Sequence, residues 1–345
     1  MLDREVEALV DGAVNGRTIA RDEAVQLLGL ASSSPEAAYV RWGAEQIART
    51  ASGGIGQIYA QIGVDANPCP EGCAFCTLSA GNSPWKGPAE VPHDVVADYA
   101  FTFDRAGAHL VSLMSTAGYD FDRFLDLVRT VRRTVSPEMP LMANIGDVDY
   151  EQARALRKAG VQAAYHTHRL GEGTVTTIDP ARRLATFEAL RRAGLVLMSA
   201  VEPVHEGSDP AEVANRMFEV IGLAPYCAGV GVLTAAPGTA MEPCKPISRK
   251  RGAYFAAVMR LCAGTSIPFG TGAGNVVWAD AGTNPRGRDL PTDLDFLKRD
   301  VARLRKELVR QEWQVPARPL PAWFEGKGPA IPSAGPCRGK GAIHA

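Results

Sequence analysis

The chain repeats one pattern, in which a segment with apolar residues at helical spacing leads into a short apolar run. In residues 93–106, Val95, Tyr99 and Phe103 lie on one helical face, and an apolar run follows Gly107. Glycine readily ends a helix because it adopts the left-handed conformation at low cost. The pattern therefore predicts a helix that leads directly into a buried strand.

This helix-to-strand pattern returns along the chain. Ala-Gly pairs at Gly160 and Gly194 separate two more helices from apolar runs, and residues 124–135 form a further apolar helical face. The candidate strands begin near Ile58, His109, Pro140, Val161, Leu195, Gly229 and Ser266. Helices and strands that alternate about every 30 residues are typical of βαβ units in a parallel sheet.

Seven such strands predict an α/β fold, a (β/α) barrel of the TIM type that is complete or open at its last strand. Residues 275–278 are the remaining strand candidate, and no helix separates them from the seventh strand. The existence of an eighth strand is therefore left undecided. In barrels of this type the chemistry takes place on loops at the carboxyl ends of the strands.

Helical segments flank the predicted barrel. Before it, Thr18 is a candidate helix cap, and Ser34 with Pro35 marks another helix start. After it, a helix is predicted over roughly residues 293–313, followed by a tail rich in proline and glycine. The expected organisation is an N-terminal helical extension (1–52), the barrel (53–285), and a C-terminal helix with its tail (286–345).

The bulk composition narrows the class of protein. With 345 residues, 46% of them hydrophobic, the chain is long enough to bury the core of such a barrel. A net charge of -1 and the lack of a long apolar run argue against nucleic acid and membrane as partners. The N-terminus lacks the pattern of a secretory signal, and seven cysteines, an odd number, do not indicate a disulfide framework. We therefore expect a protein of the reducing cytoplasm; its oligomeric state is not indicated.

The most informative stretch is NPCPEGCAFCTLSA, residues 67–80, which follows the first predicted strand. Cys69, Cys73 and Cys76 fall within eight residues in the spacing C-x3-C-x2-C. Three thiolates on so short a loop can converge on one soft metal centre. A 4Fe-4S cluster held by three cysteines leaves one iron without a protein ligand, where chemistry can occur. A structural zinc site or a chance cluster is the alternative interpretation.

This motif resembles the signature of the radical S-adenosylmethionine (SAM) superfamily, in which an aromatic residue precedes the last cysteine, as Phe75 does here. The resemblance extends to the biotin synthase-like branch, which shares the CPE start of the loop at Cys69. In that superfamily the open iron binds the amino and carboxylate groups of SAM, and reductive cleavage yields a 5'-deoxyadenosyl radical. The resemblance implies a 4Fe-4S cluster and SAM as cofactors, and an electron donor such as flavodoxin or ferredoxin.

The same resemblance implies residues that bind SAM. Phe75 is expected near the adenine, and Ser115 and Thr116, which follow the second strand, near the amino group. Arg183 matches the arginine that pairs with the SAM carboxylate in relatives, a role that suits its planar guanidinium. Glu172 is a candidate partner of the ribose hydroxyls or of the amino group.

Four further polar residues follow the predicted strands and are candidates for substrate contact and catalysis. Asn144 follows the third strand, His166 and His168 the fourth, and Glu202 the fifth. Two histidines two positions apart share one strand face. Burying both against helices would leave polar nitrogens unpaired, so we expect both to face the barrel lumen. Biotin synthase carries two asparagines at the matching positions, so the two histidines argue against specificity for the biotin precursor.

A second iron-sulfur cluster is the main open question on cofactors. Biotin synthase binds an auxiliary cluster with an arginine of its seventh strand, where this chain has Phe269, and with cysteines on earlier strands that this chain lacks. A second cluster held by Cys244 and Cys337 remains an alternative, while Cys227 and Cys262 are interpreted as apolar filling.

The resemblance thus implies a radical SAM enzyme that abstracts hydrogen from a small molecule in cofactor or vitamin biosynthesis. Two alternatives stay open: sulfur insertion with an auxiliary cluster, and a non-catalytic iron-sulfur or zinc-binding module.

Overall fold

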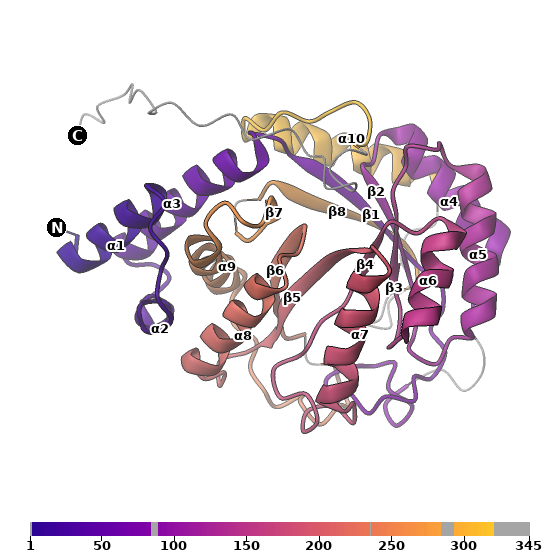
Figure 1. The fold of residues 1–345 in the computed structure, drawn as a ribbon, viewed down its shortest axis with the longest axis horizontal. Helices are drawn as coiled ribbons and strands as arrows, with labels where there is room; N and C mark the ends of the chain where they lie inside the picture. The colour runs from indigo at the N-terminus through magenta and orange to yellow at the C-terminus, as the bar shows by residue number, and fades with distance from the viewer. Residues whose placement is uncertain (1, 84–88, 235, 273, 284–292, 321–345) are drawn as a thin grey trace.

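The protein is a (β/α) barrel with helices at both ends of the chain (Figure 1). The computed structural model describes residues 2–83, 89–234, 236–272, 274–283 and 293–320. The strands in these residues are β1 (Gln57–Gly63), β2 (Leu110–Met114), β3 (Leu141–Asn144), β4 (Ala163–Tyr165), β5 (Val196–Val204), β6 (Cys227–Val232), β7 (Phe269–Gly270) and β8 (Val276–Gly282). The helices are α1 (Arg4–Val14), α2 (Arg21–Gly29), α3 (Pro35–Ser52), α4 (His93–Ala106), α5 (Phe121–Thr134), α6 (Tyr150–Ala159), α7 (Pro180–Arg192), α8 (Pro210–Gly222), α9 (Arg249–Ala263) and α10 (Leu294–Arg310).

All strands lie parallel in one sheet with the order β7-β6-β5-β4-β3-β2-β1-β8. The eighth strand, which the sequence left undecided, therefore exists and pairs with β1, with Gln57 opposite Val276 and Gly63 opposite Gly282. In the described part of the chain, β7 and β8 stand at the two ends of this order. The predicted fold class is confirmed as a nearly closed barrel, open between its last two strands.

Local sequence signals explain where most helices begin and end. Asp120, Asp149 and Asp179 each accept a backbone N–H at the start of α5, α6 and α7, as an N-cap carboxylate does. At the other end, the caps Gly107 and Gly160 have φ angles of 90° and 107°, which glycine adopts without strain.

The first predicted cap outside the barrel is wrong, whereas the second is confirmed. Helix α2 begins at Arg21, with Ala20 rather than Thr18 at its N-cap position, because Glu23 reaches back to the Ala20 N–H at 2.7 Å. Ser34 does cap α3, accepting the Ala37 N–H at 3.1 Å.

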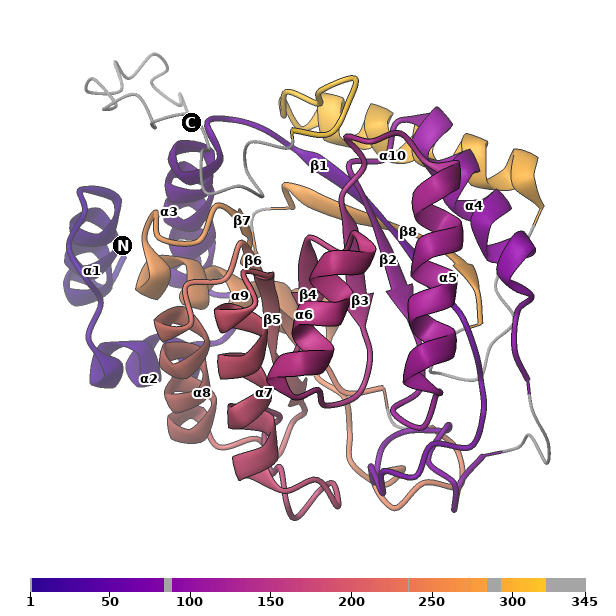
Figure 2. The ribbon, with the colours of Figure 1, turned by 45° about the vertical axis from the view of Figure 1, so that its right-hand side comes forward.

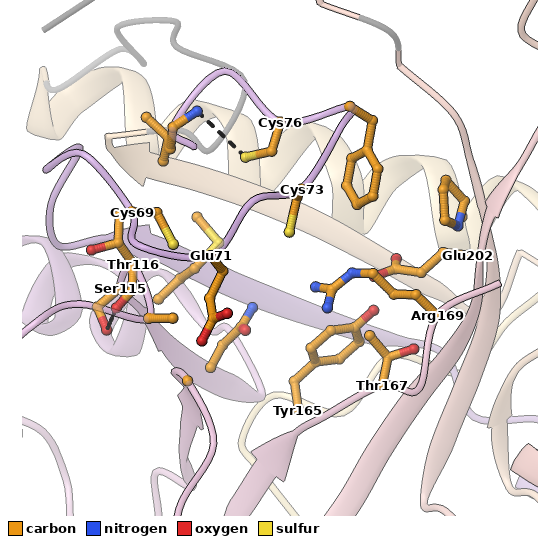
Figure 3. Close-up of a pocket in the computed structure, with 18 of the residues that line it drawn as sticks. Cys69, Glu71, Cys73, Cys76, Ser115, Thr116, Tyr165, Thr167, Arg169 and Glu202 are labelled. Atoms are coloured by element: carbon orange, nitrogen blue, oxygen red, sulfur yellow. Dashed lines mark hydrogen bonds and ion pairs between the residues drawn. The ribbon is translucent and has the colours of Figure 1, made fainter. Parts of the chain in front are cut away.

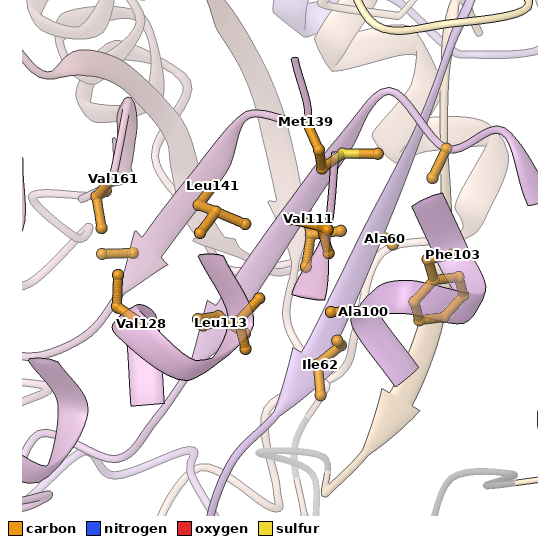
Figure 4. Packing of buried hydrophobic residues seen from close by; sticks show 14 of the residues in the cluster. Ala60, Ile62, Ala100, Phe103, Val111, Leu113, Val128, Met139, Leu141 and Val161 are labelled. Atoms are coloured by element: carbon orange, nitrogen blue, oxygen red, sulfur yellow. The ribbon is translucent and has the colours of Figure 1, made fainter. Parts of the chain in front are cut away.

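Apolar packing divides into layers inside and outside the sheet. Between β1–β3 and the helices α4 and α5, buried residues such as Leu113, Phe103 and Val128 form one core (Figure 4). Helices α1–α3 pack against α8 and α9 on another side of the barrel (Figure 2). Inside the barrel, Tyr59 and Phe269 belong to a third buried cluster formed by residues at the amino-terminal ends of the strands. This cluster fills the amino-terminal end of the barrel, so a cavity can form only at the carboxyl ends of the strands.

No helix in the described residues combines the length and the apolar character that crossing a membrane requires.

Candidate active site

A cavity of about 670 Å³ opens at the carboxyl ends of the strands. Its wall includes residues from the cysteine loop after β1 and from the ends of β2, β3, β4, β5, β6 and β8. A volume of this size accommodates a cofactor-sized ligand. The barrel therefore presents one large site where parallel-barrel enzymes carry their chemistry.

The three cysteines of the motif line this cavity from one side (Figure 3). Their loop folds on itself, because the Cys69 N–H donates to the Leu78 carbonyl at 2.6 Å and the Ala80 N–H donates to the Cys69 carbonyl at 2.8 Å. The Leu78 N–H also donates to the Cys76 sulfur at 3.4 Å. Burial raises the pKa of the Cys73 thiol to about 12 and also raises that of Cys76.

Distant loops fasten the cysteine loop in place. The Gly72 N–H donates to the Thr177 hydroxyl at 2.8 Å, and the Ala74 N–H donates to the Val175 carbonyl at 2.8 Å. The Ala74 carbonyl in turn accepts the Met241 N–H at 3.0 Å. A Cβ at Gly72 would lie 2.5 Å from the Thr177 Cγ2, so this close approach requires glycine. Glu71, the acid of the CPE motif, forms an ion pair with Arg182 of α7.

The chemistry of these donors fits an iron-sulfur cluster. Three thiols on one short loop face a common cavity, and a backbone N–H already points at one sulfur. In the described residues, no group of three or more histidine, cysteine or acidic side chains has the arrangement of a finished metal site. The loop thus carries three thiols that a cluster could bind, and the cluster itself would draw them together.

Of the residues predicted to bind SAM, Phe75, Ser115, Thr116 and Arg183 line the cavity. Thr116 is not available as a donor, since both its N–H and its hydroxyl donate to the Asp65 carboxylate, at 2.8 and 2.7 Å. Burial raises the pKa of Asp65, although these hydrogen bonds oppose the shift. The Ser115 hydroxyl donates to the Thr116 carbonyl at 3.2 Å. Asp65 therefore fixes the turn after β2.

Arg183 is 5% exposed and reaches the cavity from the first turn of α7. Its Nη1 lies 3.1 Å from the Asp147 Oδ1, and its Nε lies 3.5 Å from the Glu172 Oε2. Asp147 also accepts hydrogen bonds from the Arg182 Nε at 2.7 Å and from the Thr186 hydroxyl at 3.1 Å. One carboxylate after β3 thus orients two neighbouring arginines.

The expectation that both histidines face the lumen is wrong. The His166 ring packs edge-on against Phe187 of α7, with 4.7 Å between centroids, and its Nε2 lies 3.2 Å from the Arg183 carbonyl. Burial and the Arg183 charge lower the pKa of His166 well below its usual range. His168 pairs with Glu219 of α8 at 2.8 Å and is absent from the cavity wall, whereas His166 touches it.

The error has a physical cause. The prediction assumed that imidazole nitrogens buried against helices would lack partners. Helix α7 instead offers the Arg183 carbonyl, and α8 offers Glu219 and Arg216, both of which contact the His168 Nδ1.

The opposite face of the same segment lines the cavity and carries Tyr165, Thr167 and Arg169 (Figure 3). Sequence reasoning gave these residues no role, although the period of two that pairs the histidines also pairs these three. The Arg169 guanidinium lies 6.0 Å from the centre of the Phe75 ring and 3.7 Å from the Glu202 carboxylate. Although burial opposes it, the charges of Glu202, Cys73 and Glu172 raise the pKa of Arg169.

The two predicted glutamates have different surroundings. Glu202 lines the cavity, where Arg169 partly balances its charge. Glu172 is not part of the cavity wall: its buried carboxylate accepts the Arg169 N–H at 3.0 Å and the Thr176 hydroxyl at 2.5 Å. The predicted contact of Glu172 with SAM therefore does not fit its position. Asn144 lines the cavity at the end of β3.

The remaining cysteines lie elsewhere. Cys227 begins β6, at the end of the barrel away from the cavity, and Cys262 lies in α9; both are buried, and burial raises the pKa of each thiol to about 12. Cys244 lies in the loop before α9 and is partly exposed. Cys337 lies outside the described residues, so the predicted pairing of Cys244 with Cys337 is untested.

Comparison with known proteins finds biotin synthases that are similar to this chain. Biotin synthase of Geobacter sulfurreducens is 28% identical over 200 residues, which are 55% of this chain and 59% of the relative. The biotin synthase of Desulforudis audaxviator is 26% identical over 259 residues, 72% of this chain and 77% of the relative. The chain thus spans about three fifths of the length of the first of these relatives. No family model matches the chain.

A solved structure has the same fold. The crystal structure of methylornithine synthase (PylB) superposes with a TM-score of 0.77 at 17% identity, covering 92% of this chain and 99% of that one. The chain is thus similar in sequence to biotin synthases and in fold to methylornithine synthase, and it carries its cysteine loop at the carboxyl edge of the barrel.

Proposed function

We propose that the protein is a radical SAM enzyme that binds one 4Fe-4S cluster through Cys69, Cys73 and Cys76 and abstracts hydrogen from a small molecule. One observation carries the proposal: these thiols and Arg183 line the same cavity at the carboxyl ends of the strands. When bound, the reduced cluster would supply the electron that cleaves SAM.

Other residues of the cavity would bind SAM and the substrate. Arg183, held by Asp147 and Glu172, is suited to bind the SAM carboxylate, because its guanidinium is buried and already oriented. Phe75, adjacent to the third cysteine, offers an aromatic face for the adenine. Asn144 and Glu202 complete the polar wall on the substrate side. We propose a cofactor-biosynthetic role by analogy with the biotin synthases.

Anaerobic reconstitution tests the proposal. The protein should hold about four irons per chain, lose them in the triple Cys-to-Ala variant, and form 5'-deoxyadenosine from SAM after reduction. Arg183→Gln should weaken SAM binding by roughly 10- to 100-fold, since it removes a charge-assisted pair. Arg191→Gln, on the exposed side of the same helix, is the matched control.

Two results would redirect the assignment. A triple cysteine variant that retains its metal, or an EPR signal of the reduced protein that SAM leaves unchanged, would favour a non-catalytic metal-binding module. About eight irons per chain would instead indicate a second cluster and favour sulfur insertion.

A further inference from the structure

The guanidinium of Arg169 stands in the cavity with unused hydrogen-bonding capacity. Its Nε and Nη1 have no hydrogen-bond partner among the described residues. The nearest carboxylate oxygens, of Glu202 and Glu172, lie 3.7 Å from Nε and 3.9 Å from Nη1, beyond hydrogen-bond distance. An arginine fork presents parallel donors that match a carboxylate. Both nitrogens are buried and Arg169 lines the cavity, so a ligand that brings its own carboxylate into the cavity could supply the missing acceptors.

The surroundings hold this guanidinium in place. Glu172 accepts the Arg169 backbone N–H with one oxygen and the Thr176 hydroxyl with the other, so both of its oxygens already have donors. On the other side, Gly231 of β6 leaves the space that Glu202 occupies, since a Cβ there would lie 2.8 Å from the Glu202 Oε2. Arg169 and Glu202 are therefore two opposite charges that lie close together and are held in place by their neighbours.

Charge balance selects the kind of ligand. Arg169 already has one carboxylate on each side, so a ligand with net negative charge would add uncompensated charge to a partly buried site. A zwitterion avoids this cost, because its carboxylate can bind Arg169 while its ammonium group faces Glu202. We propose that Arg169 and Glu202 form the substrate subsite for a small amino acid, an inference that rests on the proposed function of this cavity.

Calorimetric titration of the reconstituted protein, with and without SAM, tests the subsite. The probes are the proteinogenic α-amino acids and 5-aminovalerate, each compared with its amide and with the acid that lacks the amino group. At least one amino acid should bind about tenfold more tightly than either counterpart. Arg169→Gln should remove about a tenfold share of that affinity and leave SAM affinity unchanged. Arg169→Lys, which keeps the charge but loses the fork, should give an intermediate affinity, and Arg191→Gln should match the parent protein.

Three results would overturn the inference: amides that bind as tightly as the acids, deaminated acids that bind as tightly as amino acids, or no amino acid that binds at all. A loss of SAM affinity in Arg169→Gln as large as in Arg183→Gln would also overturn it, by assigning Arg169 to the cofactor. Circular dichroism confirms that each variant is folded. If the protein binds an amino acid through Arg169 but never cleaves SAM, the proposed function fails while the subsite stands.

Discussion

Removing the charge of Asp147 should have a large effect on the stability of the protein. Its carboxylate accepts hydrogen bonds from Arg182, Arg183 and Thr186, and it lies 3.5 Å from the His166 Nε2. Asp147→Asn removes the charge and keeps one acceptor oxygen. Because the Arg183 side chain is 7% exposed, it then stays buried with Glu172, 3.5 Å away, as its remaining carboxylate partner.

The size of the stability loss follows from the charge that Asp147→Asn leaves without a partner. Removing one partner of a fully buried ion pair costs about 3–5 kcal/mol, and a hydrogen bond to a charged group is worth about 1.5–3 kcal/mol. Since Glu172 remains near Arg183 and Arg182 is half exposed, we expect Asp147→Asn to lower the free energy of unfolding by about 2–3 kcal/mol. Guanidinium titration of the reduced, cluster-free protein, followed by circular dichroism, measures this difference.

The matched control is Asp126→Asn on α5. Asp126 makes an ion pair of similar length with Arg129, 2.7 Å, but both side chains are more than half exposed. Exposed pairs contribute about 0–1 kcal/mol. If the two variants lose the same stability, Asp147 does not hold the buried arginine in the way described, and the reasoning from burial fails.

Three further predictions follow from the structure. Burial lowers the pKa of His109 to about 4, and its Nδ1 accepts the Ile58 N–H at 2.8 Å, so unfolding takes up a proton below the unfolded pKa of about 6.5. Lowering the pH from about 7.5 to 5.5 should therefore reduce the free energy of unfolding by about 1.3 kcal/mol through this residue. His109→Asn, which retains an acceptor for the Ile58 N–H, should make the free energy of unfolding less dependent on pH. A Cβ at Gly63 would lie 1.5 Å from the Thr283 carbonyl oxygen, so Gly63→Ala should lower the free energy of unfolding by at least about 1–3 kcal/mol. Gly229→Ala in β6, which has open space around it, should leave the melting temperature unchanged in the same thermal melt. Gly72→Ala should lower iron retention without changing the circular dichroism spectrum, because its Cβ would push the cysteine loop from Thr177; unchanged iron content would contradict this.

Local signals predicted most of the fold. The helix ends at Gly107 and Gly160 and the apolar runs that follow them were readable because the glycine conformation and strand burial are properties of neighbouring residues. The eighth strand was not decidable, since residues 276–282 pair with β1, more than 200 positions away. The local pattern makes residues 275–278 a strand candidate, but it does not show the distant partner that completes the strand.

In the candidate site, too, the features that depend on neighbouring residues could be predicted, and those that depend on distant residues could not. Cys69, Cys73 and Cys76 were found because a motif on one short loop carries its own geometry. The orientation of His166 and the position of Arg169 depend on which partners α7 and α8 bring to the strand, and such partners are not visible in a strand pattern.

The fastening of the cysteine loop has a consequence for biogenesis. Its backbone bonds reach Thr177 and Met241, and the latter lies 165 positions after Cys76, as the numbering shows (241 − 76). During synthesis at about 5–20 residues per second, the cysteines leave the ribosome roughly 5–20 seconds before Thr177 and roughly 8–33 seconds before Met241. Through that interval the thiols are on a loop that lacks these hydrogen-bond partners. If the loop binds an iron-sulfur cluster as proposed, the fastened form of its site would therefore exist only on a completed barrel.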